Sequence, residues 1–147
     1  AFMKKNFMKN QSSILLFEKV PLKDVSKYGI AKLNKLMKSP GTISQVLEIL
    51  EKPKLKEAPS RFAAVGRYIF DNKIFEYISE SSSNNKEIEL THAINKMIQD
   101  GNIVNATFIK GECFDCGSKL GYFRSILKSA IKKPDYKKEI LKVLKDL

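Results

Sequence analysis

Two almost unbroken apolar runs constrain this chain more than any other feature of its sequence. The first is Ser13-Ile14-Leu15-Leu16-Phe17-Glu18, and the second extends from Phe62 to Phe70. Such runs are typical of β-strands buried on both faces, because a strand with one solvated face alternates apolar and polar residues. A sheet covered on both sides needs helices, and helical patterns follow at 72–79, 88–99, 118–132 and 134–147. This order of elements predicts an α/β or α+β fold.

Weaker patterns predict the remaining elements. Residues 1–10 have the pattern of the last turns of a helix, and residues 24–30 that of a turn leading into extended chain. Residues 45–51 alternate as in a strand that ends before Pro53, and residues 102–109 predict another strand.

The net charge of +11 would suit a nucleic-acid-binding protein, but the distribution of charge argues against one. Only Arg61, Arg67 and Arg124 are arginine among the 27 basic residues, and no basic run is longer than a pair. Arginine is the residue that reads bases and binds phosphate groups in a bidentate manner. A basic nucleic-acid-binding module is therefore kept only as an alternative.

Length and cysteine content narrow the class of protein further. The 147 residues fit a single domain, 1–147, and no apolar run reaches the ~18–20 residues that cross a membrane. The first residues contain no hydrophobic stretch of the signal-peptide type, and two cysteines cannot build a disulfide framework. We therefore expect a cytoplasmic protein with no membrane partner.

Two short segments contain residues suited to ligand binding. Gly29 stands beside a predicted strand, where the missing side chain lets a ligand approach the backbone, although a simple turn glycine explains it equally. Glu51 and Lys52 end another strand: a carboxylate there can accept hydrogen bonds from neighbouring sugar hydroxyls, and the lysine can meet a phosphate. The alternative is a solvated Glu–Lys pair in a basic loop.

A third segment, Cys113-Phe114-Asp115-Cys116-Gly117, precedes a predicted helix and has several interpretations. The two cysteines have the spacing of a redox dithiol or of half a zinc site, but no second ligand pair accompanies them. Alternatively, Asp115 is the active residue, as a hard oxygen ligand for magnesium. His92, the only histidine, lacks a visible partner and is expected to be an ordinary histidine on a helix, exposed or half-buried.

Five motifs in register resemble one family. Together they resemble the C-terminal half of the bacterial UTP–glucose-1-phosphate uridylyltransferases, which are sugar nucleotidyltransferases, over about residues 10 to 147. The motifs are Val25-Ser26-Lys27-Tyr28-Gly29-Ile30, Leu50-Glu51-Lys52-Pro53-Lys54 continuing through Glu57-Ala58-Pro59-Ser60, Val65-Gly66-Arg67-Tyr68, Glu87-Ile88-Glu89-Leu90-Thr91, and Asp115-Cys116-Gly117-Ser118-Lys119-Leu120-Gly121-Tyr122.

The resemblance implies a mixed sheet flanked by helices in a Rossmann-like α/β fold. It also implies an enzyme that forms UDP-glucose and pyrophosphate from UTP and glucose 1-phosphate. The backbones of Gly29 and of Ala64–Val65 would line the sugar site, and Glu51 would accept hydrogen bonds from the glucose hydroxyls. Lys52 would be the catalytic residue that neutralises the phosphates, and Asp115 would be one of two carboxylates that hold Mg²⁺.

The chain also departs from the family pattern. Its seven glycines are scattered, so the glycine-rich phosphate loop of the family's N-terminal half has no counterpart. We therefore expect that the nucleotide-binding half is absent, that the isolated chain is inactive, and that it associates with itself or with a separate N-terminal half. A catalytically dead remnant that binds sugar phosphates is the main alternative.

Overall fold

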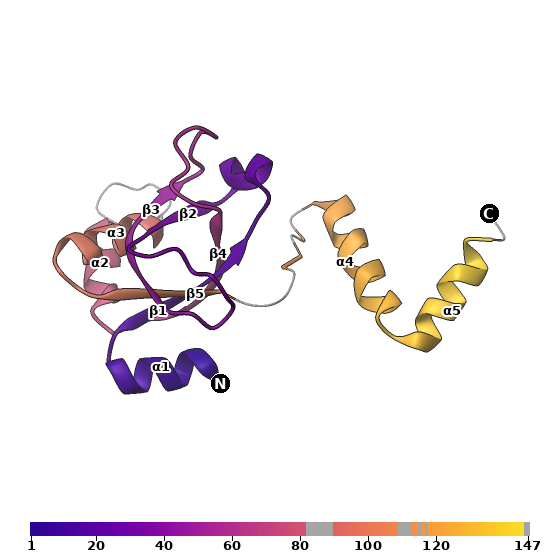
Figure 1. Cartoon of the computed structure of the whole chain (residues 1–147), viewed down its shortest axis with the longest axis horizontal. Helices are drawn as coiled ribbons and strands as arrows, with labels where there is room; N and C mark the ends of the chain where they lie inside the picture. Colours follow the sequence, from indigo (N-terminus) through magenta and orange to yellow (C-terminus); the bar gives the residue numbers. More distant parts are fainter. Residues whose placement is uncertain (82–89, 109–112, 115, 117, 146–147) are drawn as a thin grey trace. The chain divides into compact units, whose positions relative to one another are not determined.

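The computed structural model describes residues 1–81, 90–108, 113–114, 116 and 118–145, and it divides into two compact units, 1–111 and 112–147. The first unit contains five strands, which are β1 (Ser13–Lys19), β2 (Gly29–Leu33), β3 (Ser44–Glu51), β4 (Phe62–Ile69) and β5 (Val104–Phe108) (Figure 1). Its helices are α1 (Phe2–Asn10), the 3₁₀ helix η1 (Leu22–Lys27), α2 (Ile74–Ser81) and α3 (Leu90–Gln99). The second unit contains α4 (Lys119–Ile131) and α5 (Pro134–Val143).

The five strands form one closed, mixed sheet. Their order around the ring is β1-β4-β2-β3-β5, and β5 returns to pair with β1. The β1–β5 pair is parallel, whereas the other pairs are antiparallel. Helix α1 packs on β1 and β4, and the α2–α3 pair covers the sheet through β3. The prediction of an α/β fold with a mixed sheet flanked by helices is therefore confirmed.

The core lies between the strands and helix α3. Leu15 and Phe17 of β1 are fully buried and meet Ile94 and Met97 of α3 in one apolar cluster. Burying one side chain of this size contributes about 1.5–3 kcal/mol. All of β1 from Ser13 to Phe17 is buried, so the prediction of a strand covered on both faces is confirmed there.

The second apolar run forms the predicted strand but not the predicted burial. In β4, Phe62 and Ala63 are buried, whereas Gly66 and Arg67 are exposed. The reason is an irregularity in the ladder: the register with β1 shifts between Leu15 and Phe17, and Gly66 adopts a left-handed backbone with φ of 69°. The pairing is interrupted here and resumes at Tyr68 and Ile69, and the second half of the strand is only partly covered.

The second unit is a hairpin of two helices. Ser118 caps α4 by accepting a hydrogen bond from the amide of Gly121 at 3.0 Å, and Pro134 stands in the first turn of α5. Both helix starts are where the sequence predicts them. The hypothesis of a single domain without its nucleotide-binding half stays a prediction.

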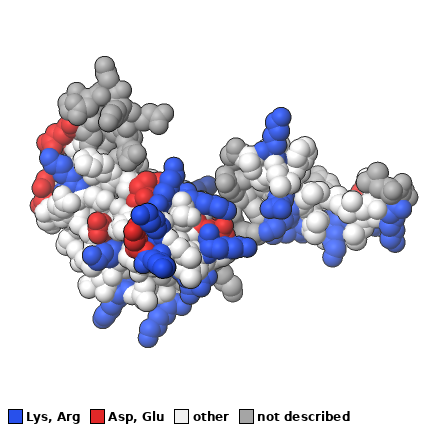
Figure 2. Space-filling model, turned by 90° about the horizontal axis from the view of Figure 1, so that it is seen from above, with Lys and Arg blue, Asp and Glu red and all other residues white. Residues whose placement is uncertain are grey.

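Lysine and arginine side chains are dispersed over the surface. On the face of the larger unit shown in Figure 2 they lie among aspartate and glutamate side chains.

Among the described helices, none combines the length and the apolar character that a bilayer crossing requires.

Candidate functional site

The sheet register brings two of the predicted site residues face to face. Gly29 begins β2, Glu51 ends β3, and the antiparallel ladder pairs them directly. A Cβ atom at position 29 would lie 2.9 Å from Oε2 of Glu51 and 3.2 Å from a methyl group of Ile49. The missing side chain of Gly29 is therefore the space in which the Glu51 carboxylate lies.

Helix α3 also contacts this carboxylate. The hydroxyl of Thr91 donates a hydrogen bond to Oε2 of Glu51 at 3.1 Å. One turn later, the side-chain amide of Asn95 makes two 2.8 Å hydrogen bonds with the backbone of Ile49, accepting from its N–H and donating to its carbonyl. Asn95 thus pairs with β3 as a neighbouring strand would, and it joins α3 to the strand that ends in Glu51.

Lys52 follows Glu51 in an unusual backbone conformation. Its φ is 44°, in the left-handed region that a residue with a side chain rarely adopts, and its amide donates to the carbonyl of Tyr28 at 3.0 Å. This hydrogen bond continues the β2–β3 pairing by one residue, and the side chains of Glu51 and Lys52 are both exposed. Left-handed residues with side chains cluster at functional sites.

The β4 segment lies on the other side of Gly29. Ile30 of β2 pairs with Ala63, so the antiparallel register continues from Ala64 toward Gly29, and Ala64 and Val65 are both half-buried. Further along, the pKa of Tyr68 is raised, mainly by burial; the backbone of Gly66 opposes the shift, and the negative charge of Glu51 adds to it. The structure therefore gathers Gly29, Glu51 and the start of β4 around one position.

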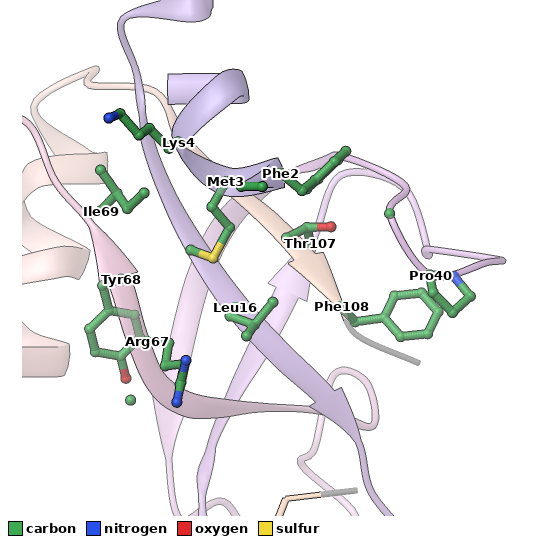
Figure 3. Close-up of a pocket in the computed structure, with 13 residues that line it drawn as sticks. Phe2, Met3, Lys4, Leu16, Pro40, Arg67, Tyr68, Ile69, Thr107 and Phe108 are labelled. Atoms are coloured by element: carbon green, nitrogen blue, oxygen red, sulfur yellow. The ribbon is translucent and has the colours of Figure 1, made fainter. Parts of the chain in front are cut away.

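A cavity lies elsewhere in this unit. It has a volume of about 790 Å³ and is lined by Met3, Leu16, Arg67, Tyr68 and Thr107, among others (Figure 3). None of Gly29, Glu51, Lys52, Ala64 and Val65 lines it. These five residues therefore lie outside the lining of this cavity.

Comparison with known proteins identifies the family. A family model described as nucleotidyl transferase matches residues 1–131. The chain belongs to this family. The UTP–glucose-1-phosphate uridylyltransferase of Haemophilus influenzae is 33% identical over all of this chain and half of its own length, and that of Staphylococcus haemolyticus is 35% identical over 92% of this chain and 46% of its own length. The chain therefore spans about half the length of these curated relatives.

Solved structures show the same relationship. A UTP-bound UGPase from Acinetobacter baumannii has a TM-score of 0.85 and 33% identity, over 99% of this chain and 49% of its own. A UDP-glucose pyrophosphorylase complexed with UDP-glucose has a TM-score of 0.76 and 34% identity, over 89% of this chain and 49% of its own. The family resemblance inferred from the five motifs is confirmed.

The magnesium prediction concerns a residue outside the described chain. Asp115 is not among the described residues, and those that are described contain no group of three or more His, Cys, Asp or Glu that could hold a metal ion. The role of Asp115 as a magnesium ligand therefore stays a prediction.

The remaining candidate residues have ordinary surroundings. Cys113 and Cys116 are exposed and are not joined in a disulfide, and the sulfur of Cys116 lies 3.3 Å from the Ser125 hydroxyl of α4. His92 is exposed on α3, in agreement with the prediction. Sequence reasoning missed Thr91 and Asn95 as contacts of the site, although two polar residues four apart on an otherwise apolar helix face are a signal that could have found them.

Proposed function

We propose that this chain is the sugar-phosphate-binding part of a uridylyltransferase that forms UDP-glucose and pyrophosphate from UTP and glucose 1-phosphate. The observation that carries the proposal is the Glu51 carboxylate, which lies against Gly29 with Thr91 on one oxygen. The names of the relatives and the UDP-glucose bound in one similar structure support this choice of substrate.

On this proposal Glu51 recognises the sugar and Lys52 recognises the phosphate. The Glu51 carboxylate accepts hydrogen bonds from sugar hydroxyls, which such a group does strongly when water is excluded. The Lys52 ammonium offsets the charge of the phosphate and, as the proposed catalytic residue, stabilises charge that changes during transfer. The backbones of Gly29 and of Ala64–Val65 line the sugar.

UTP and magnesium belong to the same proposal. The seven glycines of this chain are scattered along the sequence, and the nucleotide is proposed to be bound by chain that the relatives contain beyond the matched half. Asp115 is proposed as a ligand of Mg²⁺, a metal that would screen the phosphates when bound. On this proposal the chain by itself binds glucose 1-phosphate without forming UDP-glucose.

Calorimetric titration of the chain with glucose 1-phosphate tests the sugar role. Glu51→Ala should weaken binding about tenfold or more, the equivalent of the roughly 1.5–3 kcal/mol that a hydrogen bond to a charged group contributes. Glu48→Ala is the matched control, because Glu48 is exposed on the same strand and pairs with Lys32 at 3.7 Å. Equal affinity of the Glu51→Ala variant and the parent would contradict the proposal.

Lys52→Gly tests the phosphate role separately. Glycine accepts the left-handed backbone at this position, so the variant should be at least as stable as the parent in urea while binding the sugar phosphate more weakly. Lys54→Gly is the control, since Lys54 is an exposed neighbour paired with Glu57 at 3.9 Å. Unchanged binding by Lys52→Gly would remove Lys52 from the site. UDP-glucose synthesis by the pure chain with UTP and Mg²⁺ would show that it contains its own nucleotide site.

A further inference from the structure

Two contacts join helix α3 to strand β3, and they are about as far apart along the helix as along the strand. Thr91 and Asn95 are four residues apart, which is about 6 Å along a helix. Their partners, Glu51 and Ile49, are two residues apart, which is about 6.6 Å along a strand. Because the helix and the strand run in opposite directions, both contacts form at once: Asn95 with Ile49 and Thr91 with Glu51.

The two contacts have different partners and therefore different consequences. Asn95 satisfies backbone groups of Ile49, a residue that is only 3% exposed, so its contribution is to the stability and register of the helix. Thr91 bonds a side-chain oxygen of an exposed residue, which water could solvate equally well. The Thr91 contact contributes little to folding, but it restricts the rotamers of a flexible glutamate.

The orientation of the carboxylate follows from Thr91 together with Gly29. Thr91 binds Oε2, and the same oxygen fills the space left by the missing side chain of Gly29. Among the described side chains, Thr91 alone donates a hydrogen bond to this carboxylate, and the oxygen that accepts it is Oε2.

We infer that Thr91 is a positioning residue, which presets the Glu51 carboxylate to accept the hydroxyls of the sugar phosphate, and that Asn95 sets the helix register that makes this possible. The inference rests on the proposed function of Glu51. Gly29 takes part by providing space: in Gly29→Ala the methyl group displaces the end of the flexible Glu51 side chain, and it also presses on a methyl group of Ile49 at 3.2 Å. We expect the carboxylate to move and Ile49 to shift by a few tenths of an ångström.

Titration with glucose 1-phosphate tests the inference with a set of variants. Thr91→Val removes the hydroxyl at nearly constant volume and should weaken binding about threefold to tenfold, the cost of ordering one free side chain. Thr91→Ser keeps the hydroxyl and should restore most of the affinity. Thr42→Val is the control, because the Thr42 hydroxyl bonds the carbonyl of Ser39 in a separate turn.

A double variant separates positioning from a merely structural role. Thr91→Val should have no effect when Glu51 is already alanine, and its urea midpoint should stay at the parent value. Gly29→Ala should show the same dependence on Glu51.

The outcomes separate the two proposals. Failure of the parent to bind, or equal binding by the parent and Glu51→Ala, overturns the proposed function and this inference with it. If Glu51→Ala is weakened but Thr91→Val binds like the parent, the proposed function stands and Thr91 is not a positioning residue. Weakening by Thr91→Val that persists in the Glu51→Ala background would likewise overturn the inference.

Discussion

Asn95→Leu should unfold the larger unit more easily than any other single change of a polar side chain on α3. Leucine has a similar size but cannot bond the backbone of Ile49, so one N–H and one carbonyl lose their partners at a position that is 3% exposed. Each unsatisfied buried polar group lowers the free energy of unfolding by about 1–3 kcal/mol. Because water reaches the half-buried Asn95 site, we expect the two groups together to lower it by about 2–4 kcal/mol.

Urea unfolding followed by far-ultraviolet circular dichroism measures this cost as a change in midpoint at constant m value. Asn95→Asp keeps the acceptor and loses the donor, so it should lie between the parent and Asn95→Leu. Asn10→Leu is the control, because Asn10 is exposed and its amide bonds the side chain of Asn6 within the same helix. A cost below about 1 kcal/mol for Asn95→Leu would refute the claim that the amide replaces a strand partner.

Three further predictions concern the same unit. Phe17→Ala should lower the free energy of unfolding in urea by about 3–5 kcal/mol, because the ring is fully buried. A smaller decrease would mean that neighbouring side chains move into the cavity. Gly66→Ala should cost about 1 kcal/mol from its positive φ alone, since no atom lies within 4 Å of the added methyl group; a cost above about 3 kcal/mol would point to a clash. The hydrogen bond from Lys27 holds the pKa of Asp24 below its ordinary value of 3.8, so its stabilisation is present above that pH and is lost as the pH falls through the lowered pKa. Lys27→Met should flatten this acid-side loss in thermal melts, and an unchanged pH profile would contradict the assignment.

The sequence predicts elements of this fold better than it predicts their pairing. The apolar run at Ser13–Glu18 and the amphipathic pattern ending at Gln99 became β1 and α3, because both encode burial locally. Residues 24–30 were expected to be a turn and extended chain; the structure has η1 followed by β2, which begins at Gly29. A strand of five residues held by long-range partners leaves little local signal.

For the candidate site, too, the sequence predicts the residues better than their arrangement in space. Glu51 and Gly29 are candidates from their residue types and from the resemblance, but nothing in their separation along the chain indicates that they face each other, since that follows from the β2–β3 register. The contribution of α3 depends on how a helix docks onto a strand, which no spacing within the helix determines. Asp115 lies outside the described residues, and its role stays a prediction.

The parallel pair of β1 and β5 determines when this unit can form. Ser13 pairs with Val104, so the parallel partner of β1 lies about ninety residues later in the chain. During synthesis β1 remains without its parallel neighbour until nearly the whole unit has left the ribosome. Until then β1 can pair only with β4, and a nascent chain that stops before Val104 leaves one edge of this apolar strand without its partner. Such a product is a substrate for chaperones and proteases.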